Sequence, residues 1–197
     1  DWESLGDDWR GLYQPSMEEV RTGRRAFTIL DVLHRESLET LLERRGIRGL
    51  SGADLDHMTK AWHRLEPWLD SRDGLARLKS RYIIGPLSNG NLGLLVRMAK
   101  HAKLPWDVVL SAETARAYKP QPEAYLRSAA LLNLAPAEVM LVAAHNSDLA
   151  AAQACGLATA FVARPTEYGP HQKKDFAATG AWTVVASSFT EIGRAHV

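Results

Sequence analysis

Leucines recur at helical spacing through the first third of the chain, with polar residues between them. One apolar stripe ends before Gly46 and consists of Leu33, Leu38, Leu41 and Leu42. A second stripe ends before Pro67 and consists of Leu55, Met58, Ala61, Trp62 and Leu65. Apolar residues three or four positions apart predict amphipathic helices, and Gly and Pro are typical of helix ends. Residues 1–66 are therefore expected to form a small helical unit.

From Leu75 onward, short apolar runs alternate with helical patterns. The expected strands are Tyr82–Leu87, Val108–Leu110, Val139–Ala143, Ala158–Val162 and Thr183–Ala186. The expected helices are Leu92–Ala102, Pro122–Leu132 and Leu149–Ala154. Strands that alternate with helices of this length predict a parallel sheet with helices on both faces. The sequence therefore predicts an α/β protein with a doubly wound, Rossmann-like core over residues 67–190.

Polar side chains occupy the predicted strand ends. Ser88 and Asn89 lie in LSNGN, Lys119 lies in YKPQPEAY and Asp148 lies in AAHNSDLA, while the loop ARPTEYG follows Val162. Because the carboxyl ends of parallel strands share one edge of a sheet, the first three sets are expected to converge. A hydroxyl and an amide donate to an anion, a lysine keeps carboxylates charged, and an aspartate accepts a proton. The sequence therefore predicts a polar pocket at this edge.

Each of these residues also has an ordinary structural explanation. Lys119 alone is typical of a solvated loop, Asp148 of a helix N-cap and Ser88 of a turn before a helix. Burying a lysine or an aspartate alone costs several kcal/mol. Lys119 and Asp148 are therefore better explained together, as a buried pair.

The composition limits the partners. The chain has 197 residues, with 24 Lys and Arg against 23 Asp and Glu, so no broad basic surface for nucleic acid or anionic lipid is expected. No apolar run is long enough to span a bilayer. Cys155, the single cysteine, lies in an apolar helical stretch, which favours a buried, unreactive thiol and a cytoplasmic location. The expected partner is a small molecule, and a homodimer is left open.

Five segments together resemble the haloacid dehalogenase (HAD) superfamily, closest to the type II L-2-haloacid dehalogenases. These segments are DWRGLYQP, AWHRLEPW, LSNGN, YKPQPEAY and GLATAFVARPTEYG. The resemblance extends to about Phe189. It implies a HAD-like core with a small helical cap, and hydrolysis of short 2-haloalkanoic acids to 2-hydroxy acids. It implies neither a metal nor an organic cofactor.

The resemblance also implies a catalytic set. In this family an aspartate at the end of the first core strand displaces the halide and forms an aspartyl ester, which water then hydrolyses. Ser88 would hold the nucleophilic carboxylate or the substrate carboxylate. Lys119 would keep the carboxylates ionised, and Asp148 would pair with Lys119 and orient or activate the water.

A second group of residues is implied to bind substrate and halide. Arg10 matches the cap arginine that binds the substrate carboxylate and the halide, although an arginine beside a tryptophan is usually a surface cation. Asn89 would stabilise the leaving halide, and Tyr125 matches a pocket tyrosine. Relatives often carry serine and asparagine where this chain has Ala143 and His145, so His145 is expected to replace the amide.

The expected nucleophile has no counterpart in the chain. The family pattern carries it in an apolar strand, upstream of the cap and in the middle of the sheet, and follows it with a Gly-Thr turn. The only similar segment is FTILDVLHRES, but helical spacing continues after Asp31, so Asp31 is expected to be a helix N-cap. We therefore expect the first strand and its aspartate to lie upstream, and residues 1–197 alone to be inactive.

The last seven residues, EIGRAHV, are expected to be foreign to the protein. One back-translation of them reads as a common sequencing adapter. Residues 191–197 are therefore expected to be a non-native tail.

Two other functions stay open from the sequence. A phosphatase of the same superfamily would bind Mg²⁺ at the same strand ends, which requires clustered acidic oxygens. The residues directly before Asp148, from Ala143 to Ser147, include no acid. The other alternative is a module without catalysis that binds a partner, or a second copy, through its cap.

Overall fold

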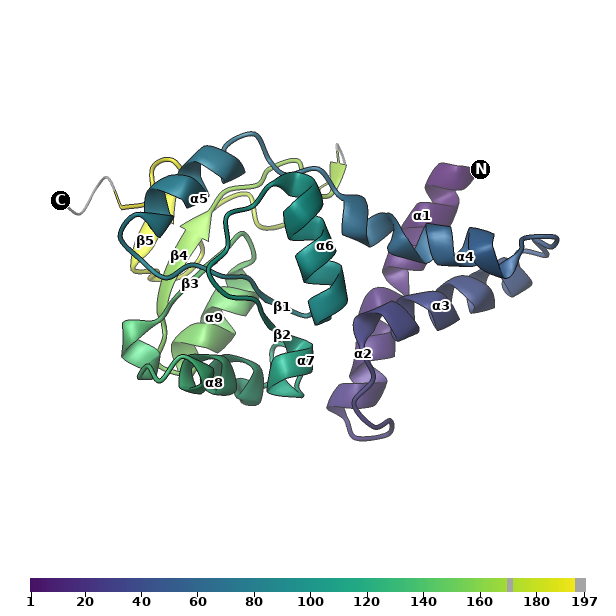
Figure 1. The fold of residues 1–197 in the computed structure, drawn as a ribbon, viewed down its shortest axis with the longest axis horizontal. Coiled ribbons are helices and arrows are strands. Elements are labelled where there is room, and N and C mark those ends of the chain that lie inside the picture. Colours follow the sequence, from purple (N-terminus) through teal and green to yellow (C-terminus); the bar gives the residue numbers. More distant parts are fainter. Residues whose placement is uncertain (170–171, 194–197) are drawn as a thin grey trace.

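The first part of the protein is helical. A computed structural model describes residues 1–169 and 172–193. The first helices are α1 (Trp2–Gly11), α2 (Tyr13–Arg21), α3 (Leu30–Arg44), α4 (Gly52–Thr59) and the 3₁₀ helix η1 (Lys60–Arg64). Figure 1 shows α1–α4 gathered at one end of the molecule, away from the strands. These helices occupy the segment in which the leucine spacing predicts them.

Apolar side chains on α1 and α3 hold this helical unit together. Leu5 and Trp9 of α1 pack against Leu38, Leu41 and Leu42 of α3, and all five are buried. Full burial of one such side chain stabilises the fold by about 1.5–3 kcal/mol. The predicted stripe therefore faces the interior of the helical unit.

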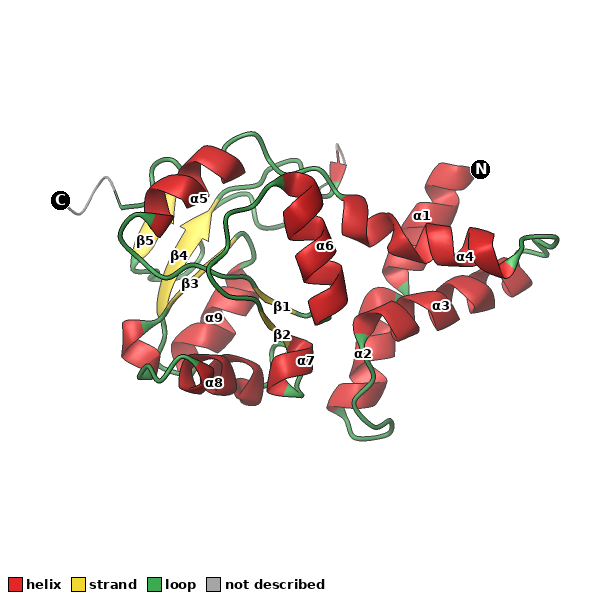
Figure 2. Ribbon diagram, viewed as in Figure 1, coloured by secondary structure: helices red, strands yellow, loops and turns green. Residues whose placement is uncertain are grey.

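The second part contains strands and helices in alternation. Its strands are β1 (Leu87–Ser88), β2 (Leu110–Ser111), β3 (Met140–Ala143), β4 (Ala158–Val162) and β5 (Val184–Ala186). Its helices are α5 (Ser71–Lys79), α6 (Leu92–Ala102), α7 (Ala112–Ala115), α8 (Pro122–Leu131), η2 (Pro136–Glu138) and α9 (Asn146–Ala154). Figure 2 shows the strands enclosed by helices. The prediction of an α/β fold with parallel strands and a HAD-like arrangement is confirmed.

The strands form two separate parallel sheets. β1 pairs with β2, and β4 lies between β3 and β5. Within residues 1–169 and 172–193, no strand pairing joins the two sheets. The described strands therefore make up one two-stranded and one three-stranded sheet. That an upstream strand lies in the middle of the sheet stays a prediction.

The first predicted strand, Tyr82–Leu87, is much shorter in the structure. The backbone N–H of Ile84 donates to the carboxylate of Asp107, at 3.0 Å, instead of to a neighbouring strand. Pro86 has no N–H to donate. Only Leu87–Ser88 therefore forms a ladder, with β2.

Helices cover both faces of the three-stranded sheet. On β4, Phe161 packs with Tyr125 of α8 and Leu149 of α9. The next residue, Val162, packs with Leu78 of α5 on the opposite face. Successive side chains of a strand point to opposite faces, so β4 needs apolar residues at both positions.

Two helix starts differ from expectation. The N-cap of α3 is Ile29, and Asp31 lies within the first turn, so the prediction that Asp31 is an N-cap is wrong. Its carboxylate bonds instead to side chains distant in the sequence. The N-cap of α9 is His145, so Asp148 is not an N-cap either.

Cys155, at the end of α9, is half-buried, whereas the sequence predicts a buried thiol. Its partial burial raises the pKa of the thiol.

The last residues are described only to Gly193. Ile192 is buried against Leu78, Val162 and Ala186, and the Arg77 guanidinium donates to its carbonyl oxygen. Residues 194–197 lie outside the described residues, and the assignment of 191–197 as a non-native tail stays a prediction. Across the described ranges, no helix is both long and apolar enough to cross a membrane.

Candidate active site

A lysine and an aspartate from distant segments meet at the strand ends. The Lys119 ammonium lies 2.5 Å from Oδ2 of Asp148, and the Tyr125 hydroxyl donates to Oδ1 of Asp148 at 2.6 Å. Only 18% of the Lys119 side chain and 14% of the Asp148 side chain are exposed. Burial, and then the neighbouring Asp148 carboxylate, raises the pKa of Tyr125, which therefore stays a neutral donor. Lys119 and Asp148 thus form a buried pair, and the Tyr125 hydroxyl binds the second oxygen of the same carboxylate.

The turn after β1 joins this group through Asn89. The Asn89 side-chain oxygen accepts from the backbone N–H of Lys119 at 2.8 Å, and its amide donates to the Tyr13 hydroxyl at 3.3 Å. Ser88, one residue earlier, accepts from the backbone N–H of Gly90 at 3.1 Å. Asn89 therefore lies between the Lys119 loop and the helical unit.

A second polar group contains Arg10 and His145. Nε2 of His145 lies 2.9 Å from both carboxylate oxygens of Glu167 and 3.2 Å from the Tyr168 hydroxyl. The Arg10 guanidinium of α1 lies over the Tyr168 ring, 4.5 Å from its centre. The hydrogen bond to Glu167 raises the pKa of His145, against the effect of burial. When His145 is protonated, the group therefore holds two cations, Arg10 and His145, beside the Glu167 carboxylate.

The Asp148 carboxylate influences the pKa of one residue in contact with the first group and of one residue in the second group. Burial raises the pKa of Tyr13, and the Asp148 carboxylate adds to that increase. The Asp148 carboxylate also contributes to the raised pKa of His145, after Glu167 and Asp175. Asp148 thus acts on residues of both groups. We call Ser88, Asn89, Lys119, Tyr125, Asp148 and His145 the strand-end rim.

Several contacts at the rim were not predicted. Tyr13 belongs to the motif DWRGLYQP, and Glu167 and Tyr168 belong to the loop ARPTEYG, but the sequence alone indicates no role for any of the three. Arg10 contacts the rim through Tyr168, and this contact joins residues that lie far apart in the sequence.

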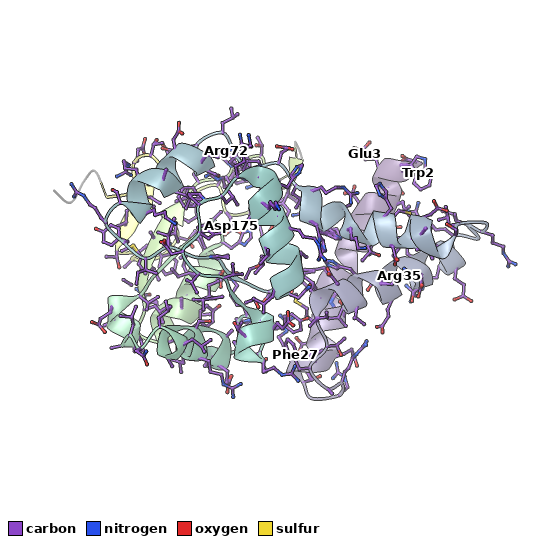
Figure 3. All side chains as sticks on the ribbon, viewed as in Figure 1. Trp2, Glu3, Phe27, Arg35, Arg72 and Asp175 are labelled. Carbon is purple, nitrogen blue, oxygen red and sulfur yellow. The ribbon has the colours of Figure 1, made fainter. Side chains whose placement is uncertain are left out.

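Figure 3 shows Phe27 at the boundary between the helical unit and the core, where it stacks on Tyr118.

The described residues form no obvious metal centre. In the part of the chain that the structure describes, no three His, Cys, Asp or Glu side chains are grouped so as to hold a metal ion. Two surface hollows of about 380 and 400 Å³ lie on the helical unit, the first around Asp8 and Arg45 and the second around Arg48 and Leu55. Neither hollow includes a residue of the strand-end rim. Because the rim carries the interacting polar groups, it is the candidate site.

The described residues form a parallel α/β core, a helical unit and a lysine–aspartate pair at the strand ends. The sequence model of the haloacid dehalogenase-like hydrolase family matches residues 5–156. The chain therefore belongs to this family.

Particular relatives agree with the family assignment. The (S)-2-haloacid dehalogenase of Xanthobacter autotrophicus is 35% identical over 114 residues, which is 56% of this chain and 44% of that protein. The solved structure of the defluorinating L-2-haloacid dehalogenase Rha0230 is 53% identical with a TM-score of 0.93, covering 95% of this chain and 77% of that one.

A third comparison is with a solved structure that holds a covalently bound ligand. The L-2-haloacid dehalogenase of Xanthobacter autotrophicus with chloropropionic acid covalently bound is 25% identical with a TM-score of 0.79. That match covers 96% of this chain and 84% of that one. The chain spans less than half the length of the first curated relative that it matches.

Proposed function

We propose that the protein to which this chain belongs hydrolyses short 2-haloalkanoic acids to 2-hydroxy acids at the strand-end rim. The observation that carries the proposal is the contact of Lys119 with Asp148, both mostly buried, beside Asn89 and Tyr125. The similarity to 2-haloacid dehalogenases supports this choice of substrate class.

The proposed reaction has two steps. In the first, a carboxylate attacks the carbon that bears the halogen; a C–O bond forms, the C–halogen bond breaks, and the halide leaves with its electron pair. In the second, water attacks the carbonyl carbon of the resulting ester, which releases the 2-hydroxy acid and restores the carboxylate. Overall, one water is consumed, and one halide and one proton are released.

Lys119, Asp148 and Tyr125 suit the second step. The Lys119 ammonium pairs directly with the Asp148 carboxylate and satisfies one of its oxygens. The Tyr125 hydroxyl and the ammonium each hold one oxygen of Asp148, which fixes the plane of the carboxylate. Each oxygen retains a further lone pair with which Asp148 would orient or deprotonate the water.

Asn89, Arg10 and His145 suit the binding of anions. One N–H of the Asn89 amide points to Tyr13, and the other remains for a halide. Arg10 and a protonated His145 would attract the substrate carboxylate and the leaving halide. Ser88 would hold a carboxylate at the same turn.

We propose that the nucleophilic aspartate is supplied by sequence upstream of Asp1. Asp31 bonds to His63 and Asn91, and Asp148 bonds to Lys119 and Tyr125, so both carboxylates already hold positioning contacts. Residues 1–197 expressed alone are accordingly expected to release no halide.

Halide release tests the proposal directly. The protein expressed from its complete gene would be incubated with fluoroacetate, chloroacetate and each enantiomer of 2-chloropropionate, and free halide would be measured. We expect halide and 2-hydroxy acid in equal amounts. Phosphate release from phosphate esters with added Mg²⁺, without halide release, would favour the phosphatase and overturn the proposal.

Isotope labelling tests the ester. In H₂¹⁸O with enzyme in excess over substrate, the first product molecule is expected to carry unlabelled oxygen, because its oxygen comes from the enzyme carboxylate. Labelled product in that first turnover would instead indicate direct attack by water and contradict the ester step.

A further inference from the structure

Asn91 occupies the N-cap position of α6 but does not cap that helix. An asparagine at this position usually accepts from a backbone N–H of its own first turn. Here no such bond forms. The N–H of Leu92 donates instead to the Glu113 carboxylate at 2.8 Å. The Asn91 side chain therefore does not bind the first turn of α6, although Asn91 is buried, with only 4% of its surface exposed.

The Asn91 amide pairs with Asp31 of the helical unit. Its side-chain oxygen accepts from the backbone N–H of Asp31 at 3.2 Å, and its NH₂ donates to Oδ2 of Asp31 at 3.1 Å. The N–H of Asp31 lies in the first turn of α3, where backbone donors have no partner within the helix. A core residue thus caps a helix of the helical unit.

His63 completes this arrangement from a third element. Nε2 of His63, on η1, lies 2.9 Å from Oδ1 of Asp31. Because an ionised carboxylate only accepts, Nε2 of His63 carries the proton. The His63 side chain is 3% exposed, against 25% for Asp31, and η1 itself packs against α6. Both oxygens of Asp31 are therefore held, one from η1 and one from α6.

The turn that carries Asn91 also carries Asn89 of the candidate site. Asn89 precedes Asn91 by two residues and contacts both Tyr13 of α2 and the backbone of Lys119. Gly90 between them is buried, and its N–H donates to the Ser88 hydroxyl oxygen. A displacement of Asn91 would therefore carry Asn89 with it.

We propose that Asn91, Asp31 and His63 are positioning residues that clasp the helical unit to the turn Ser88–Asn91, and so hold Arg10 and Asn89 at one distance across the site. None of the three touches a residue of the strand-end rim through its side chain in these contacts. They act through the placement of α3 and of the turn. We call them the clasp.

The clasp has a defined consequence for substrate binding. If the helical unit moves away from the core for part of the time, the apparent substrate affinity falls in proportion to the fraction of closed molecules. Once substrate is bound in the closed form, the chemical step proceeds at its usual rate. Loss of the clasp is therefore expected to raise KM and to leave kcat nearly unchanged; this part of the inference rests on the proposed function.

Four variants of the protein expressed from its complete gene test the clasp. Asn91→Ala removes it, and Asn91→Asp replaces it with two facing carboxylates. The double variant Asp31→Asn/Asn91→Asp exchanges the amide and the carboxylate, so that the same hydrogen bonds re-form in reverse. Glu113→Ala is the matched control, because it uncaps α6 at the same helix end without touching Asp31.

Hydrogen exchange without substrate is the first measurement. Asn91→Ala is expected to speed exchange at the Asp31 amide about tenfold, in line with the loss of one buried hydrogen bond to a helix terminus. Asn91→Asp is expected to do more, and the double variant to restore protection. Glu113→Ala should speed exchange at Leu92 only. Unchanged exchange at Asp31 in Asn91→Ala, or equal exchange there in Glu113→Ala, would overturn the clasp.

Steady-state kinetics with a 2-haloacid is the second measurement. Asn91→Ala is expected to raise KM about tenfold with kcat within about threefold, and the double variant to return KM toward the original value. A fall in kcat at constant KM would overturn the positioning role. A protein that releases no halide but shows the expected exchange pattern would contradict the proposed function alone, since exchange is measured without substrate.

Discussion

Replacement of Lys119 by methionine leaves the Asp148 carboxylate without its cation. The side chains of the pair are 18% and 14% exposed, so little water reaches the carboxylate. Removing one partner of a buried ion pair costs about 3–5 kcal/mol. Because the Tyr125 hydroxyl continues to donate to Asp148, we expect the lower end, about 3 kcal/mol. For a chain of this size, that loss lowers Tm by about 6–12 °C.

A double-mutant cycle separates the pair from general damage. Lys119→Met/Asp148→Asn removes both charges and keeps an acceptor for Tyr125, so its stability is expected within about 1 kcal/mol of the original protein. The control Arg24→Met breaks the exposed pair with Glu19, whose side chains are 57% and 51% exposed, and should leave the stability almost unchanged because water screens this pair.

Urea denaturation of the protein expressed from its complete gene, followed by fluorescence and circular dichroism, provides the free energies. A typical domain is stable by about 5–15 kcal/mol, so Lys119→Met should remain folded at room temperature. Equal destabilisation in the single and the double variant would show that the two charges are not coupled. That result would refute the description of Lys119 and Asp148 as a buried pair.

Three further predictions concern single residues. Arg10→Ala should raise KM for a 2-haloacid at least about tenfold, as expected for the loss of a charged contact. The control Arg24→Ala, on the same helical unit, should leave KM unchanged. Equal KM values for the two variants would contradict the role of Arg10. Glu167→Gln should lower the pKa of His145 in an NMR titration. Since the pKa of His145 is raised above 6.5 in the folded protein, the stabilisation by this contact is present below pH 6.5 and is lost as pH rises through the folded value, and Glu167→Gln should abolish that dependence. Burial lowers the pKa of His34 from 6.5 to about 4, so the folded state should lose up to about 3 kcal/mol as pH falls through this range. His34→Phe should remove that loss in urea denaturation, and an unchanged acid dependence would contradict the argument.

The strand-end residues were predictable because topology alone brings them together. Asn89, Lys119 and Asp148 follow strands or strand connections of a parallel core, so their chain positions imply one edge. The pairing of Lys119 with Asp148 follows from the cost of burying either charge alone. The catalytic and binding roles rest on the family resemblance and stay proposals.

Contacts between the helical unit and the core were not predictable. Asp31 was expected to be an N-cap because local preference was the only information available for it. Its partner Asn91 lies sixty residues away, and a side chain that caps a distant helix leaves no periodic pattern in the sequence. The missed contact of Arg10 with Tyr168 has the same origin.

The error in the first strand also has a specific cause. Tyr82–Leu87 is apolar and resembles a buried strand, but strand identity requires a ladder partner. Asp107 takes the N–H of Ile84 through its side chain, and the ladder therefore starts only at Leu87. The apolar character of the segment gives no sign that the Asp107 carboxylate competes for this N–H.

The most direct test of the strand-end rim as the catalytic site is the initial rate of chloride release from 2-chloropropionate. It would be measured at equal folded concentrations for the protein expressed from its complete gene and for its Asp148→Asn variant, which keeps an acceptor for Tyr125. We predict rapid release by the former and a rate at least about a hundredfold lower in the variant, the loss typical of a missing acid–base group. A variant that retains near-full activity would contradict the account.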